Sequence, residues 1–219
     1  MRKLCFLAVL GLAATVAQAQ HSDVEIVVEN GALAVEPSAE GLFAFEGELG
    51  VFPFPANVGE QPGFEADPGV FNPGDSLAFN VVTNLLYWNG AAFAAVPGGH
   101  DMSISNIVES VSVGAASGPQ AGFEIGVADA GGGLHEDLTF TLNGPGAPDG
   151  LTIGAYGLWL ALSSPQYDAS NEFIILLNYG LGEDEFEAGV QAAGALVPEP
   201  ATAALLAALA AALMSRRRA

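Results

Sequence analysis

The stretch DVEIVVENGALAV at residues 23–35 sets the pattern that most of the chain repeats. Val24, Ile26 and Val28 alternate with residues that are mostly acidic, which is the two-residue period of a strand with one buried face. Asn30-Gly31 follows, a pair that tight type I′ turns prefer, and then a second apolar run begins. The sequence therefore predicts a β-hairpin near the start of the folded part of the chain.

Short strands continue along the chain. A second hairpin is expected at residues 77–96 around Asn89-Gly90, and further strands are expected at 102–113, 122–127, 134–142, 151–163 and 172–178. The segment 151–162 is apolar on both faces, as a central strand would be. The segment 57–75, rich in glycine and proline, is expected to be a long irregular loop.

Residues 41–54 form an aromatic stretch that is expected to fill the core with Phe43, Phe45, Phe52 and Phe54. No segment between the two ends of the chain shows a sustained helical period. Many short strands separated by Gly, Pro and Asn turns predict an all-β domain, an antiparallel β-sandwich or jelly roll.

The N-terminal end has the order of an export signal. Arg2 and Lys3 precede an apolar segment at 4–16, and Ala17-Gln18-Ala19 offers the small residues of a cleavage site. This order predicts a signal peptide at 1–19, so that the exported chain begins at Gln20. The only cysteine, Cys5, is removed with the peptide, which excludes disulfides and thiolate metal ligands from the mature protein.

The C-terminal end has three parts: Val197-Pro198-Glu199-Pro200, an apolar run at 201–214, and the basic cluster Arg216, Arg217 and Arg218. As a helix the run covers roughly 21 Å, less than the bilayer core of about 30 Å, so it spans if the bilayer thins or the arginines snorkel. The arginines favour the cytoplasmic side. The pattern predicts a single transmembrane helix, with the rest of the chain outside.

This tail resembles the PEP-CTERM sorting signal of Gram-negative bacteria over residues 197–219. The resemblance implies that an exosortase-type enzyme detaches the tail as the protein crosses the inner membrane on its way to the cell surface or extracellular matrix. An ordinary anchor helix is the alternative. The expected organisation is a signal peptide at 1–19, a β-sandwich domain at 20–182, an acidic and then Ala/Gly-rich linker at 183–196, and the sorting signal at 197–219.

The charges are divided sharply along the chain. All five Lys and Arg residues belong to the two targeting segments, whereas all 25 Asp and Glu residues except Glu199 lie between them. The domain therefore has no lysine or arginine to neutralise phosphate, which excludes nucleic acid and anionic membrane surfaces as partners. Metal ions, or the basic parts of another protein, are the partners that the negative charge of the domain favours. The alternative is that the acids only keep a surface protein soluble.

Each of the three histidines stands one or two residues before a carboxylate. His21 with Asp23, and His135 with Asp137, have the i, i+2 spacing that places two side chains on one face of a strand. The two pairs would converge as a site of two imidazoles and two carboxylates, with His100 as a further candidate. Zinc accepts these ligand types. Solvated histidines on outer strand faces are the alternative.

Three segments of the domain resemble the zinc-uptake-regulator-repressed PEP-CTERM proteins: GLFAFEGELG at 41–50, HEDLTF at 135–140 and GAYGLWL at 154–160. The resemblance implies a role in zinc-poor conditions, such as zinc capture or storage. That family has a second histidine where this chain has Asp137. The difference implies weaker zinc binding or a preference for another divalent ion.

The sequence favours a non-catalytic protein. It lacks the G-x-S-x-G nucleophile elbow, and its three scattered histidines define no Ser-His-Asp triad. An exported protein that binds a divalent metal, zinc first, is the leading hypothesis. Two others stay open: a structural or adhesive matrix protein whose acids provide solubility and ionic cross-links, and an enzyme acting on polysaccharide through paired carboxylates. Extracellular polysaccharide is accordingly a candidate partner.

Overall fold

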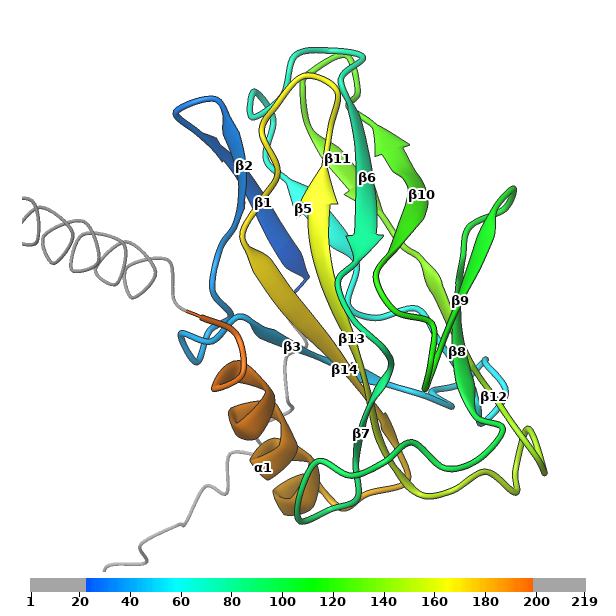
Figure 1. The fold of residues 1–219 in the computed structure, drawn as a ribbon. Helices are drawn as coiled ribbons and strands as arrows, with labels where there is room; N and C mark the ends of the chain where they lie inside the picture. Colours follow the sequence, from blue (N-terminus) through cyan, green and yellow to red (C-terminus); the bar gives the residue numbers. More distant parts are fainter. Residues whose placement is uncertain (1–22, 199–219) are drawn as a thin grey trace, which may run out of the picture.

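The computed structural model describes residues 23–198, which form fourteen strands and one helix (Figure 1). In chain order these are β1 (Val24–Glu29), β2 (Ala32–Val35), β3 (Ala44–Glu48), β4 (Val58–Gly59), β5 (Phe64–Ala66), β6 (Ser76–Val81), β7 (Leu86–Trp88), β8 (Asp101–Ser105), β9 (Ser110–Gly114), β10 (Gln120–Val127), β11 (Leu134–Glu136), β12 (Thr139–Asn143), β13 (Gly154–Ser163), β14 (Glu172–Tyr179) and α1 (Glu183–Gly194). The prediction of a mostly β chain is confirmed.

The predicted signal peptide, His21, and the tail from Glu199 onward with its predicted transmembrane helix lie outside the described residues. Within 23–198, α1 is too short and too polar to cross a bilayer, and no other helix is present.

The strands form three sheets. Two have four strands, in the orders β11-β5-β1-β2 and β4-β12-β8-β9. The third has six, along the path β10-β6-β13-β14-β3 with β7 beside β13. Most neighbours are antiparallel, whereas β1 with β5 and β14 with β3 are parallel. β5 thereby lies inside a sheet, between β1 and β11, although it has only three residues.

One apolar core joins all three sheets. Alternate residues of β13 and β14 enter it and meet side chains from both small sheets: Tyr156, Leu158, Phe173 and Ile175 from the large sheet, and Ile26, Phe64, Met102 and Phe140 from the small ones. Burial of apolar surface is the main favourable term in folding. The core therefore fixes which residues of each strand point outward.

The opposite face of the large sheet is covered by α1 (Figure 1). Phe186 and Val190 of the helix pack on Ile174 and Leu176 of β14 in a second apolar cluster. The prediction of a linker at 183–196 is therefore wrong. The helical stripe is faint in the sequence, because Gly189 and Ala193 complete its i, i+3, i+4, i+7 spacing and only two of its four buried residues are large.

The first predicted hairpin is confirmed. β1 and β2 pair in antiparallel register, with Glu29 opposite Ala32 next to the turn. Asn30 and Gly31 have φ values of 52° and 87°. Two consecutive positive φ values define the type I′ turn, which Asn-Gly adopts with less strain than other residue pairs.

Two predicted strands are each divided. The segment 102–113 is a hairpin of β8 and β9, because the Asn106 side chain accepts hydrogen bonds from the N–H groups of Val108 and Glu109 and so holds a turn. The segment 134–142 divides into β11 and β12, which belong to different sheets.

The second predicted hairpin forms only in part. β6 and β7 both pair with β13, but beyond Asn89-Gly90 the pairing continues through a single bridge between Trp88 and Phe93. The Asn89 side chain accepts hydrogen bonds from two backbone N–H groups, which opens the turn beyond two residues. No strand forms at 91–96.

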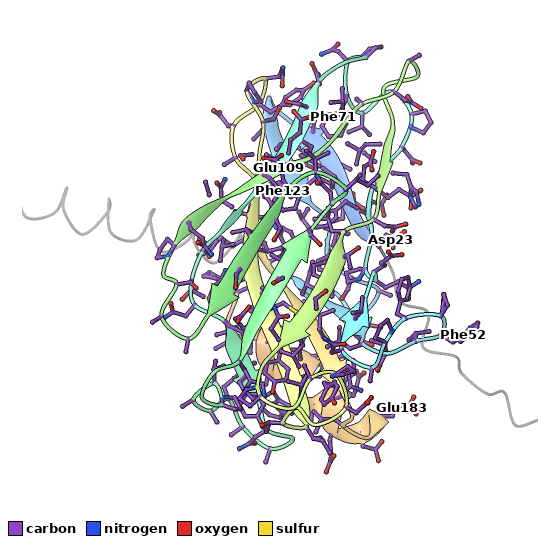
Figure 2. All side chains as sticks on the ribbon, turned by 90° about the vertical axis from the view of Figure 1, so that its right-hand side faces the viewer. Asp23, Phe52, Phe71, Glu109, Phe123 and Glu183 are labelled. Atoms are coloured by element: carbon purple, nitrogen blue, oxygen red, sulfur yellow. The ribbon has the colours of Figure 1, made fainter. Side chains whose placement is uncertain are left out.

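Two further expectations are corrected. Phe52, expected in the core, is 93 % exposed and projects from a surface loop (Figure 2). The expected loop at 57–75 contains β4 and β5. Both strands are too short for their alternation to stand out between the prolines and glycines of this segment.

Candidate metal centre

Three metal-ligating side chains meet on the outer face of the sheet β11-β5-β1-β2. Asp23 precedes β1, Glu65 lies on β5, and His135 lies on β11. One ligand atom from each lies within 4.8 Å of the other two. Glu65 and His135 are exposed and Asp23 is half-buried. Figure 2 shows Asp23 at the surface of the molecule. The fold thus brings Asp23 and His135 together, with Glu65 between their strands.

The strand register accounts for this meeting. His135 pairs directly with Glu65 in the antiparallel ladder of β11 and β5, so their side chains leave the same face. On the other side of β5, the Val24 N–H donates to the Gly63 carbonyl at 2.9 Å. The Gly63 N–H donates to Asp23 Oδ1, also at 2.9 Å. This second hydrogen bond fixes the Asp23 carboxylate beside the end of β5.

Asp137 borders the cluster. Its Oδ1 atom lies 2.6 Å from the point that a Cβ on Gly63 would occupy, and Asp23 Oδ1 lies 3.2 Å from the same point. The absence of a side chain at Gly63 therefore leaves room for both carboxylates. Asp137 and His135 are both exposed, as their i, i+2 spacing predicts, but Asp137 does not belong to the three groups that define the cluster.

The outer face of this sheet is acidic beyond the cluster itself. Glu25 lies beside Glu65 in the parallel register of β1 and β5. Repulsion from Glu36, then burial, then repulsion from Asp67 and Glu65 raise the pKa of its carboxyl. A raised carboxyl pKa of this origin indicates a local excess of negative charge. A bound cation would relieve that excess of negative charge. Residues 20–197 contain no lysine or arginine that could do so.

The donor set fits zinc. Imidazole nitrogen and carboxylate oxygen bind zinc at about 2.0–2.2 Å, so tetrahedral ligand atoms lie roughly 3.4 Å apart. The spacing of up to 4.8 Å is wider, and binding requires the exposed Glu65 and His135 side chains to rotate inward. Three protein ligands leave one tetrahedral position for water or a fourth group. Glu65 and His135 also line an open depression of about 360 Å³.

His100 lies elsewhere and has a different role. It is 7 % exposed and directly precedes β8. The first residue of β8, Asp101, pairs with Asn143, the last residue of β12. Asp137 precedes the opposite end of β12, so His100 lies away from the cluster. Its Nε2 accepts a hydrogen bond from the Thr152 N–H at 3.3 Å, and its Nδ1 lies 3.4 Å from the Gly98 carbonyl. Both ring nitrogens thus have backbone partners, and His100 is a core residue outside the cluster.

Glu65 is the member of the cluster that the sequence did not predict. The glycines and prolines around it indicate a loop, whereas the structure gives a strand whose burial alternates at Phe64-Glu65-Ala66. That short alternation is the only local sign of a strand in the sequence. The segment becomes a strand because it pairs with β1 on one side and β11 on the other. The predicted ligand His21 lies outside the described residues.

Comparisons with known proteins add no family to these observations. No protein-family model matches the chain, and no curated protein matches it. The function is therefore inferred from the sequence and from the geometry of the cluster.

Proposed function

We propose that this chain is an exported, non-catalytic protein of the cell surface or extracellular matrix that binds one divalent metal ion, zinc first. The ligands are Asp23, Glu65 and His135, with Asp137 beside them. The observation that carries the proposal is the approach of three candidate ligand atoms to within 4.8 Å of one another, from β5, from β11 and from the residue before β1. The paired strands fix the backbone positions of these residues, so that only their side chains have to be ordered on binding, which limits the entropy lost.

Export rests on the sequence. The signal peptide pattern at 1–19 and the tail that resembles a PEP-CTERM signal support secretion and processing by an exosortase-type enzyme. For the domain we propose a β-sandwich of jelly-roll type. The large sheet facing two small sheets across one shared core supports this architecture.

Calorimetric titration of the full-length chain with zinc, in mild detergent at moderate salt, tests the metal site. We expect one site per chain. His135→Ala and Glu65→Gln should each weaken binding by more than the roughly 10- to 100-fold that outer ligand partners contribute. Glu109→Gln removes the same charge from an exposed position outside the cluster and should leave affinity unchanged. Mildly acidic pH should weaken binding, because protons compete for the imidazole.

A polyanionic matrix protein predicts a different titration. Heat would be spread over many weak sites and suppressed by salt, because screened surface charges attract cations only diffusely. Glu65→Gln and Glu109→Gln would then cause equal, small changes. That outcome would overturn the specific site and leave the structural function.

A further inference from the structure

Exposed apolar side chains gather on two loops of the domain. Of the seven large apolar side chains that are exposed in the described residues, four lie on these loops. Val51 and Phe52 belong to the loop between β3 and β4, and Phe52 is nearly fully exposed (Figure 2). Ile107 and Val108 belong to the turn between β8 and β9, and both are nearly fully exposed. Single exposed apolar residues are ordinary, whereas a group of them marks a surface that another molecule covers.

Two depressions in the surface connect the loops. The first, of about 250 Å³, is lined by Phe52, and the second, of about 480 Å³, is lined by Ile107. Glu60 and Asp137 line both depressions, so the two are direct neighbours. We call the combined surface the two-loop groove. It has an apolar loop at each end and carboxylates between them.

The turn at the second end of the groove is held by hydrogen bonds. The Asn106 Oδ1 atom accepts from the N–H groups of Val108 and Glu109, at 2.8 and 2.7 Å. The amide nitrogen of the same side chain donates to the Glu124 carbonyl of β10 at 3.3 Å. The turn therefore presents Ile107 and Val108 from a fixed backbone.

The loop at the first end is closed and anchored. The Gly50 N–H donates to the Val58 carbonyl at 2.8 Å, which closes the base of the loop. The amide of the buried Asn57 donates to the Leu142 carbonyl of β12 at 3.0 Å. Because both loops are already ordered, little backbone entropy is lost when a partner binds to their apolar side chains.

The floor of the groove is acidic. Besides Glu60 and Asp137, Glu48 lines the first depression and Glu136 lines the second. Residues 20–197 contain no lysine or arginine that could cover these carboxylates. A second copy of the domain would bring the same negative charge, and an anionic lipid surface would be repelled as well. Charge complementarity therefore selects a basic partner.

We propose that the two-loop groove binds a basic segment of another protein that has apolar side chains at both ends. The apolar side chains pack on Phe52 and Ile107, and the lysine or arginine side chains between them lie over Glu60 and Asp137. In the first depression a cation can also approach the rings of Phe52 and Phe54, whose faces attract positive charge. The inference goes beyond the proposed metal site and does not rest on it.

A labelled peptide tests the groove. The probe is a blocked synthetic peptide with lysines at its centre and leucines at both ends. Its fluorescence anisotropy is titrated with the full-length chain, in mild non-ionic detergent without metal and at moderate salt. We expect saturable binding of one peptide per chain. A second peptide, with serines in place of the leucines, should bind much more weakly.

Variants of the exposed side chains locate the binding surface. Phe52→Ala and Ile107→Ser should each weaken binding by roughly tenfold or more, as truncation of a central interface residue does. Ile153→Ser is the matched control, because Ile153 is exposed but lines neither depression. Both substituted side chains of the groove are exposed, so the fold should persist.

A charge variant tests the floor of the groove. Glu60→Gln should weaken binding by up to roughly fivefold, the range of an exposed ion pair. Glu29→Gln, at an exposed position that lines neither depression, should leave it unchanged.

Three outcomes would overturn the proposal. Equal affinity of the leucine and serine peptides would show that the acids attract cations only diffusely. Unchanged binding in Phe52→Ala and Ile107→Ser would place the peptide elsewhere. If sedimentation shows that these variants dissociate a dimer while peptide binding is unchanged, the groove is an interface between copies of this chain.

Discussion

Glu65 on β5 lies directly opposite His135 on β11, so that a carboxylate and an imidazole face each other across an antiparallel pair. Alone, such a pair is an ordinary surface contact worth a fraction of a kcal/mol, on the order of 0.2–1. Asp23, which precedes the parallel strand β1, lies on the other side of β5, and one possible ligand atom of each residue lies within 4.8 Å of the other two. A shift of one residue in either register would turn a ligand toward the core. The cluster therefore depends on register as much as on residue type.

Gly63→Ala should weaken metal binding while the fold persists. A Cβ at this position would lie 2.6 Å from Asp137 Oδ1 and 3.2 Å from Asp23 Oδ1, and both atoms end side chains that can move aside. We expect the metal dissociation constant to rise roughly tenfold, as for the loss of an outer-shell contact, with little change in the thermal midpoint. Gly98→Ala, whose Cβ would meet nothing within 4 Å, is the control. If Gly63→Ala binds zinc with unchanged affinity, Asp23 is not a ligand of the metal.

His100→Ala should destabilise the protein without changing its zinc binding. The ring is buried against Tyr156, at a centroid distance of 6.0 Å, and accepts the Thr152 hydrogen bond. Its removal leaves a cavity, and we expect the free energy of unfolding to fall by about 2–4 kcal/mol. Denaturant unfolding measures this loss, and titration of the folded variant measures zinc stoichiometry. A folded His100→Ala variant that no longer binds zinc would contradict our placement of this residue.

Tyr167→Phe should raise the pKa of Asp75. The Tyr167 hydroxyl donates to the Asp75 carboxylate, and this bond, ahead of those from Asn72, holds the Asp75 pKa below its ordinary value. A lowered folded-state pKa contributes stability above the ordinary pKa, and this contribution is lost as the pH falls through the folded-state value. The variant should therefore be less stable at neutral pH, and the difference should vanish in strong acid.

Carbon-detected NMR titration of the Asp75 carboxyl measures this shift. The matched control is Tyr87→Phe, because the Tyr87 hydroxyl donates to the Ile153 carbonyl and not to a carboxylate. It should leave the Asp75 titration unchanged. An identical Asp75 titration in Tyr167→Phe and the unmodified chain would show that the hydrogen bond does not set its pKa.

The features that the sequence predicts are those that neighbouring residues determine. Asn30-Gly31 specifies its turn through the φ values of two residues, and the alternation of β1 specifies its buried face. By contrast, α1 and β5 depend on distant partners. The weak apolar stripe of Phe186 and Val190 stabilises a helix only because β14 offers an apolar face for it to pack on. Similarly, β5 forms a strand because β1 and β11 pair with it on either side.

In the candidate site, too, the sequence predicts what neighbouring residues determine and misses what depends on distant ones. Ligand chemistry and the i, i+2 spacing single out Asp23, His135 and Asp137 from the sequence. Glu65 resembles many other acids until the pairing of β5 is known. His100 also precedes an acid, yet its environment is set by the distant residues Thr152 and Tyr156. Spacing alone does not distinguish a buried histidine from an exposed one.

Added salt should stabilise this protein. Residues 20–197 contain no lysine or arginine, so interactions among the charges of the domain are repulsive wherever the histidines are neutral. Raising the ionic strength from about 0.01 M to 0.1 M shortens the screening length from about 30 Å to 10 Å. In most proteins this change also weakens attractive ion pairs, but here it mainly relieves repulsion. We expect the thermal midpoint of the metal-free chain to rise over this range. Sodium chloride and sodium perchlorate should give the same rise at low concentration, because screening depends on ionic strength and not on the identity of the anion. A midpoint that falls with salt would show that repulsion among the acids does not limit the stability of the fold.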